Sequence, residues 1–210
     1  MTSNRFKKQL DFLIEIDKVK NILRMTSIAD GSRRENDAEH SWSLAMMALL
    51  FHEYMPHTDI LKVIKMVLIH DLVEIYAGDT FAFDETGYED KEEREQLSAD
   101  KIFGILESDQ GQELRRLWDE FEACETEEAQ YAAMLDRLHP FIMNYLHEGG
   151  TWKVHQITDE QVYKRNQITL DKGPQEFIDF IHEVVGSEGT PDSVNPSVVD
   201  EEEEDRKSVV

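Results

Sequence analysis

The sequence predicts an all-α fold: one helical bundle over residues 1–185, followed by a disordered acidic tail over residues 186–210. Apolar residues recur at spacings of three and four through most of the chain, which is typical of the buried face of an amphipathic helix. No segment shows a convincing alternation of apolar and polar residues, so we expect no strand of substantial length.

The helices carry recognisable start and stop signals. Asn36 is expected to cap a helix over residues 37–54, with Glu39 as its capping-box partner. Thr58 or Asp59 is expected to cap the next helix, which continues through residue 69 and ends near Gly78. Further helices are predicted at about 4–24, 88–107, 110–122, 125–148 and 159–184, the last one broken at Gly173 and Pro174.

The chain of 210 residues is strongly acidic. It contains 45 Asp and Glu against 22 Lys and Arg, which gives a formal net charge of −23. No basic stripe is present, and this argues against binding to a nucleic-acid duplex, because such binding neutralises phosphates with Lys and Arg. An anionic ligand must therefore be captured locally, by a metal ion or a few arginines. The acidic run at 200–205 has almost nothing to bury, hence the predicted disorder.

Three observations favour a cytoplasmic protein that does not enter a membrane. Cys124 is the single cysteine, so no intramolecular disulfide is expected, and this fits a reducing compartment. The longest fully apolar run, residues 44–51, is far shorter than the roughly 20 residues that cross a bilayer. The amino-terminal apolar stretch is interrupted by Asp11 and Glu15, unlike a signal peptide.

Polar groups interrupt the apolar helix that precedes residue 70. On a helix His70, Asp71 and Glu74 share one broad face, and residues 63–69 before them are mostly apolar. Burying an imidazole and ionised carboxylates together is costly unless other charges compensate. A divalent cation is the natural compensator.

Two other predicted helices supply further candidate ligands. His40 lies one turn inside the helix 37–54, and Asp136 interrupts an apolar stretch of the helix 125–148. With His70 and Asp71 they form a His-His-Asp-Asp set, which suits manganese, cobalt, iron, zinc or magnesium. Four protein ligands in an octahedral shell leave two positions for water or substrate, as a hydrolase requires.

This order of histidines and aspartates resembles the HD-domain superfamily of metal-dependent phosphohydrolases, and most closely its five-prime deoxynucleotidase branch. The resemblance is carried by the stretches ENDAEHSW (35–42), HDLVEIYAGD (70–79) and LDRL (135–138). It implies a single helical HD domain that binds one divalent metal ion, and it suggests a homodimer.

The resemblance also implies roles for individual residues. His40, His70, Asp71 and Asp136 match the metal ligands of the family. Glu74 and Asp79 match acidic residues that handle the attacking water or the proton of the leaving group, and Arg24 matches an arginine near the substrate. Arg33 or Arg34 on the neighbouring loop is a further candidate for phosphate binding, because guanidinium groups match phosphate oxygens. Members of the branch often carry, just after the substrate arginine, a tryptophan that is taken to crowd a ribose 2'-hydroxyl. This chain continues Met25-Thr26-Ser27 instead, which leaves deoxy selectivity open.

Three functions remain in competition. The first is hydrolysis of a 5'-(deoxy)nucleoside monophosphate or another small phosphate monoester, and it is favoured. The second is another HD chemistry, namely hydrolysis of a cyclic nucleotide or a nucleoside triphosphate. The third is a catalytically idle, metal-binding regulatory domain, against which Glu74 counts because a structural metal needs no proton carrier.

Overall fold

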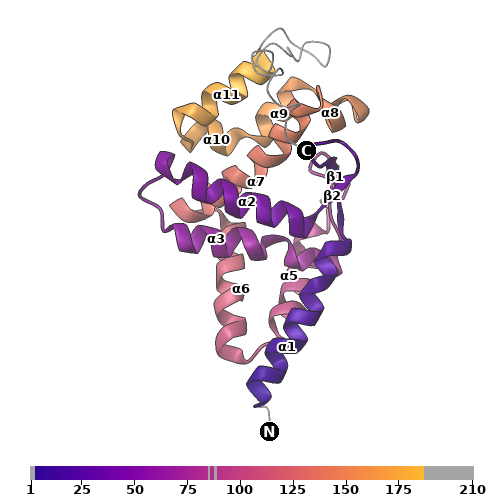
Figure 1. The fold of residues 1–210 in the computed structure, drawn as a ribbon, viewed down its shortest axis with the longest axis vertical. Coiled ribbons are helices and arrows are strands. Elements are labelled where there is room, and N and C mark those ends of the chain that lie inside the picture. The colour runs from indigo at the N-terminus through magenta and orange to yellow at the C-terminus, as the bar shows by residue number, and fades with distance from the viewer. Residues whose placement is uncertain (1–2, 85, 88, 187–210) are drawn as a thin grey trace, which may run out of the picture.

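The computed structural model describes residues 3–84, 86–87 and 89–186 (Figure 1). The α-helices are α1 (Asn4–Ile16), α2 (Asp37–Phe51), α3 (Ile60–Ile69), α4 (Glu74–Ala77), α5 (Lys91–Phe103), α6 (Ser108–Ala123), α7 (Glu127–Leu146), α8 (Gly150–Val154), α9 (Asp159–Arg165), α10 (Gln167–Lys172) and α11 (Gln175–Gly186). The remaining elements are the 3-10 helices η1 (Asp17–Asn21), η2 (His52–Tyr54) and η3 (His70–Val73) and the strands β1 (Leu23–Ser27) and β2 (Arg34–Asn36).

The all-α prediction is confirmed, and so are several helix ends. The Asn36 side chain accepts a hydrogen bond from the Glu39 N–H at 3.0 Å, and the Glu39 carboxylate accepts one from the Asn36 N–H at 3.2 Å, which completes the capping box. Asp59 caps α3, and α10 and α11 are separated at Gly173 and Pro174 as predicted. The predicted tail lies, from residue 187 on, outside the described residues.

The prediction of one helix over residues 4–24 is wrong at its carboxyl end. The α-helix ends at Ile16, and the chain then forms η1 and the strand β1. β1 pairs antiparallel with β2 across an irregular register, in which Leu23 faces Asn36 and Ser27 faces Arg34. The Arg34 guanidinium donates to the carbonyls of Leu23 and Arg24 and so holds the irregular stretch of β1 in place. Both strands of this small sheet are short, in keeping with the expectation that no strand of substantial length is present.

Two other predicted helices are shorter than expected. The helix after Asp59 ends at Ile69, and residues 70–77 continue as η3 and α4 up to Gly78. Gly78 takes φ +81°, a value that favours glycine, and its N–H donates to the Glu74 carbonyl. The stretch 159–172 is divided at Asn166 into α9 and α10. In a 3-10 turn residues three apart lie above one another, so Asp71 and Glu74 remain neighbours in η3 and α4.

The core consists of two clusters that meet near the polar residues. α2, α3 and α7 pack against one another and, with α11, enclose the larger cluster. α1, η3, α5 and α6 enclose the smaller one. Figure 1 shows α2 and α3 crossing the middle of the molecule, with α1, α5 and α6 on one side and α8–α11 on the other. Within the described part of the chain, no helix has the length and apolar character needed to cross a bilayer.

Candidate metal centre and active site

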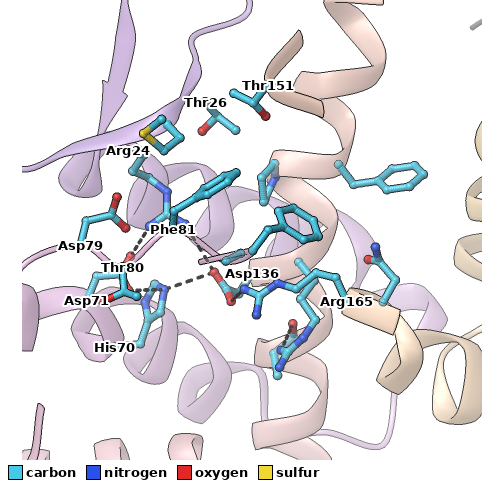
Figure 2. Close-up of a pocket in the computed structure, with 18 of the residues that line it drawn as sticks. Arg24, Thr26, His70, Asp71, Asp79, Thr80, Phe81, Asp136, Thr151 and Arg165 are labelled. Atoms are coloured by element: carbon cyan, nitrogen blue, oxygen red, sulfur yellow. Dashed lines mark hydrogen bonds and ion pairs between the residues drawn. The ribbon is translucent and has the colours of Figure 1, made fainter. Parts of the chain in front are cut away.

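The four predicted metal ligands converge from three elements. His40 comes from the first turn of α2, His70 and Asp71 from η3, and Asp136 from the middle of α7. Asp136 Oδ1 lies 3.1 Å from His40 Nε2 and 3.6 Å from His70 Nε2. Asp71 Oδ1 lies 3.1 Å from His70 Nε2 (Figure 2). Asp71 Oδ2 lies 4.0 Å from His40 Nε2.

His70 is held with one ring nitrogen facing the carboxylates. Its Nδ1–H donates to the Val67 carbonyl at 2.9 Å, and the Trp118 indole N–H donates to the His70 carbonyl at 3.2 Å. Its Nε2 is buried and makes no hydrogen bond to any residue that the structure describes, although two carboxylates lie within 4 Å. An imidazole lone pair directed at carboxylate oxygens would be repulsive, so this position calls for a cation, either a proton on Nε2 or a metal ion bound between the nitrogen and the carboxylates. The residues therefore fit a divalent metal ion.

His40 is oriented from behind by two further buried side chains. Its Nδ1 lies 3.1 Å from Nδ1 of His139, and Glu35 Oε2 lies 3.7 Å from the Nδ1 atom of each histidine. Burial, with the positive charges of His40 and Arg24, lowers the pKa of His139 to about 3, so His139 is neutral. Its Nδ1 can accept from the His40 Nδ1–H in the tautomer of His40 that metal binding at Nε2 requires. The same contact leaves His40 Nε2 free to bind a metal.

Carboxyl groups with raised pKa values lie beside the ligand set. Glu74 and Asp37 form a buried group with Asp71, in which their oxygens lie within 4.8 Å of one another. Burial and the neighbouring Asp71 raise the pKa of Asp37 to about 7 and raise the pKa of Glu74. Burial also raises the pKa of Asp79, which lines the same pocket. With a pKa of about 7, Asp37 can exchange a proton near neutral pH, and the raised pKa values of Glu74 and Asp79 favour proton transfer by these two groups as well.

Arg24 and Arg33, two of the predicted substrate arginines, lie in different surroundings. Arg24 projects from β1 into the site, where its Nη1 lies 2.7 Å from Asp71 Oδ2 and 3.5 Å from Asp37 Oδ1. Although burial opposes its charge, the carboxylates of Asp71 and Asp136 raise the pKa of Arg24. Arg33 is not brought into the pocket, because its half-exposed side chain is held in a bidentate ion pair with Glu39, at 2.6 and 2.8 Å. The substrate role of Arg33 thus gains no support from its position.

The site opens into a pocket of about 200 Å³. Its floor carries Arg24, His70, Asp71, Glu74 and Asp136, and its walls include aromatic side chains from the segment after α4, from α7 and from α8. These aromatic residues are Phe81, Phe83, Phe141 and Trp152. The arrangement can hold a charged group at the floor and an apolar ring against the walls.

Sequence reasoning missed Asp37, Glu35 and Arg165 as residues of this site. Asp37 is fully buried, yet an acidic residue in the first turn of a helix is ordinarily explained by the helix dipole. Glu35 was part of the quoted ENDAEHSW stretch, but only the pairing of β2 turns its side chain inward. Arg165 lies on α9, and its Nη2 is 3.6 Å from Asp136 Oδ2; no local pattern signals this approach.

The fold and the site together define a helical metal-dependent hydrolase. The HD-domain family profile matches residues 16–177, which is well over half of the chain, and the chain belongs to this family of metal-dependent phosphohydrolases.

Similar proteins agree with this assignment. The chain is 30% identical over 146 residues to 5'-deoxynucleotidase HDDC2 of Dictyostelium discoideum, covering 66% of this chain and 77% of the relative. It is 28% identical over 151 residues to the human protein of the same name, covering 71% and 73%. A crystal structure of a predicted metal-dependent phosphohydrolase from Magnetospirillum magnetotacticum is 47% identical, with a TM-score of 0.80 over 87% of this chain and 91% of that one.

Proposed function

We propose that the protein hydrolyses a 5'-nucleoside monophosphate to the nucleoside and phosphate, with His40, His70, Asp71 and Asp136 as the metal ligands. The observation that carries this proposal is the placement of Glu74 and Arg24 in one pocket with three of the four ligands, His70, Asp71 and Asp136. A purely structural metal site needs neither a proton carrier nor a buried arginine. The relatives named 5'-deoxynucleotidase support the choice of substrate class.

Each part of the pocket has a task in this reaction. Arg24 holds the phosphate by charge and hydrogen bonds, and the aromatic walls take the base by stacking or edge contacts. A bound divalent cation would polarise the phosphate and lower the pKa of a water molecule. Glu74 takes the proton from the attacking water, because its oxygens lie next to Asp71 in a buried group. Asp79, on the adjacent wall, returns a proton to the departing 5'-oxygen. No covalent intermediate is required.

Selectivity between deoxyribose and ribose depends on the side chains that follow Arg24. Met25 and Thr26 line the pocket at this point, and no tryptophan crowds the 2' position from there. Methionine is flexible and adapts to neighbouring groups. We therefore expect the protein to accept ribonucleotides together with deoxyribonucleotides, and to discriminate between them weakly.

The test is phosphate release by the purified protein after it has been stripped of metal and reloaded with manganese or cobalt. The substrates are matched deoxy- and ribonucleoside 5'-monophosphates, 3'-phosphates, cyclic nucleotides and triphosphates. We expect release from 5'-monophosphates only with metal, and a kcat at least about 100-fold lower in Glu74→Gln, the usual scale for loss of a general acid or base.

Glu160→Gln on the exposed first turn of α9 is the matched control and should leave kcat unchanged. Turnover of cyclic nucleotides or triphosphates without turnover of 5'-monophosphates would contradict the proposal and favour the alternative HD activity, hydrolysis of a cyclic nucleotide or a nucleoside triphosphate. Manganese binding without release from any substrate would favour a regulatory domain.

A further inference from the structure

The pocket contains more carboxylates than cations, although its proposed substrate carries a phosphate dianion. Among the residues that the structure describes, the lysine and arginine side chains that line it are Arg24, Lys91, Arg137 and Arg165. Lys91 pairs with Glu95 at 3.1 Å, and the Arg137 guanidinium donates to the Ala133 carbonyl at 2.7 Å. Arg24 is deep in the site and is bound to Asp71 at 2.7 Å. Besides Arg24, to which the proposed function already assigns the phosphate, Arg165 is therefore the lining cation to consider for contact with an incoming anion.

Arg165 lies on the opposite side of Asp136 from the histidines. Asp136 Oδ1 faces His40 Nε2 and His70 Nε2, whereas Asp136 Oδ2 lies 3.6 Å from Arg165 Nη2. Arg24 Nη2 lies 3.9 Å from Asp136 Oδ1, so two guanidinium groups from distant parts of the chain flank one carboxylate. Figure 2 shows Arg24 and Arg165 reaching Asp136 from different directions.

The position of Arg165 is set by the helix that carries it. Thr158 and Gln161 form a capping box at the start of α9, and Val162 and Asn166 are buried. The Asn166 side-chain amide donates to the Val162 carbonyl at 2.9 Å, which closes the last turn of α9, and the burial of both residues packs this end of the helix against the core. The Arg165 side chain remains 28% exposed, twice the 14% of Arg24, and its Nη2 is beyond hydrogen-bond distance from Asp136 Oδ2. The Arg165 guanidinium can therefore turn toward a phosphate oxygen without breaking a hydrogen bond to Asp136 Oδ2.

We propose that Arg165 binds the phosphate of the substrate from the α9 wall, opposite Arg24, so that the anion is held between two guanidinium groups above Asp136. This inference rests on the proposed function, since it assigns a phosphate-binding residue to that site. A guanidinium offers two parallel donors to two phosphate oxygens, which fixes the rotation of the phosphate as well as its position. Arg165 thus acts on binding and orientation, while Glu74 acts on the proton.

The experiment is calorimetric titration of inorganic phosphate into the manganese-loaded protein, with manganese affinity measured separately for each variant. We expect Arg165→Met to weaken phosphate binding by roughly tenfold or more, the scale of a lost hydrogen bond between charged groups. Manganese affinity should stay within about twofold of the unmodified protein, because Arg165 is not a ligand. Arg165→Lys should recover part of the phosphate affinity, since lysine keeps the positive charge but lacks the two parallel donors of a guanidinium group.

Lys164→Met is the matched control. Lys164 is the exposed neighbour of Arg165 on the same helix, and its substitution by methionine also removes one positive charge. It should leave phosphate binding unchanged. The proposal is overturned if Arg165→Met binds phosphate normally, if the unmodified protein does not bind phosphate, or if manganese affinity falls in parallel, which would make Arg165 a support for Asp136. Phosphate binding requires no nucleotide turnover, so a loss specific to Arg165→Met would stand even if 5'-monophosphates proved not to be substrates.

Discussion

His70 shows how one residue prepares the site for a cation. Its Nδ1–H is committed to the Val67 carbonyl, so only Nε2 faces Asp71 and Asp136. Although burial opposes the charged form, these carboxylates raise the pKa of His70 to about 10. A proton on Nε2 and a metal ion therefore compete for the same position.

This competition predicts proton release when manganese binds. Below pH 10 His70 carries the proton before the metal arrives, and ligation requires its loss, so about one proton should leave per manganese at pH 8. The release should decline, and the affinity should level off, as the pH rises through 10. Calorimetry in buffers of different ionisation enthalpy measures the number of protons that are released for each manganese ion bound. Binding at pH 8 without proton release would show that His70 is not a ligand or is already neutral.

At the scale of elements, the site depends on where α2 begins. The capping box of Asn36 and Glu39 fixes the first turn, and His40 follows within that turn with its side chain fully buried. The same asparagine ends β2, whose Glu35 contacts both His40 and His139. One short segment thus sets the strand, the helix and the metal ligand together.

Removal of this cap should weaken both the fold and the metal site. Asn36→Ala is expected to lower the free energy of unfolding by about 1 kcal/mol, the usual cost of losing an N-cap. It should also lower manganese affinity, because the turn that carries His40 frays. Denaturant unfolding and metal titration measure the two effects. Ser3→Ala removes the cap of α1, which carries no ligand, and should cost stability alone; equal losses of metal affinity in both variants would refute this local coupling.

The sequence was sufficient to predict the ends of helices that are determined by residues close to them in the chain. The caps at Asn36 and Asp59 and the break at Gly173 depend on neighbouring residues, and the structure has all three. The end of α1 could not be predicted, because β1 exists through its pairing with β2 beyond an intervening turn. The conversion to η3 at His70 was likewise hidden, since residues 70–77 keep a helical pattern of polar and apolar residues.

At the scale of the whole molecule, the metal centre lies where the elements of both core clusters come together. α2 and α7 bring His40 and Asp136 from the larger cluster, and η3 brings His70 and Asp71 from the smaller one. The candidate ligands were predictable because the family spacing of His and Asp is visible in the sequence. Asp37 and Arg165 were not, because their approach to Asp71 and Asp136 is created by tertiary packing. The homodimer suggested by the resemblance stays a prediction.

The most direct test of the metal centre is a crystal structure of the manganese-loaded protein with an anomalous difference map. We expect one strong peak, from a manganese ion that is bound by Nε2 of His40, Nε2 of His70 and carboxylate oxygens of Asp71 and Asp136, with Glu74 beside it. Manganese-bound nitrogen and oxygen atoms should lie about 2.0–2.3 Å from the peak, as is usual for divalent first-row metals. A peak elsewhere, or manganese bound without either histidine, would contradict the assignment of the ligands and with it the proposed hydrolysis.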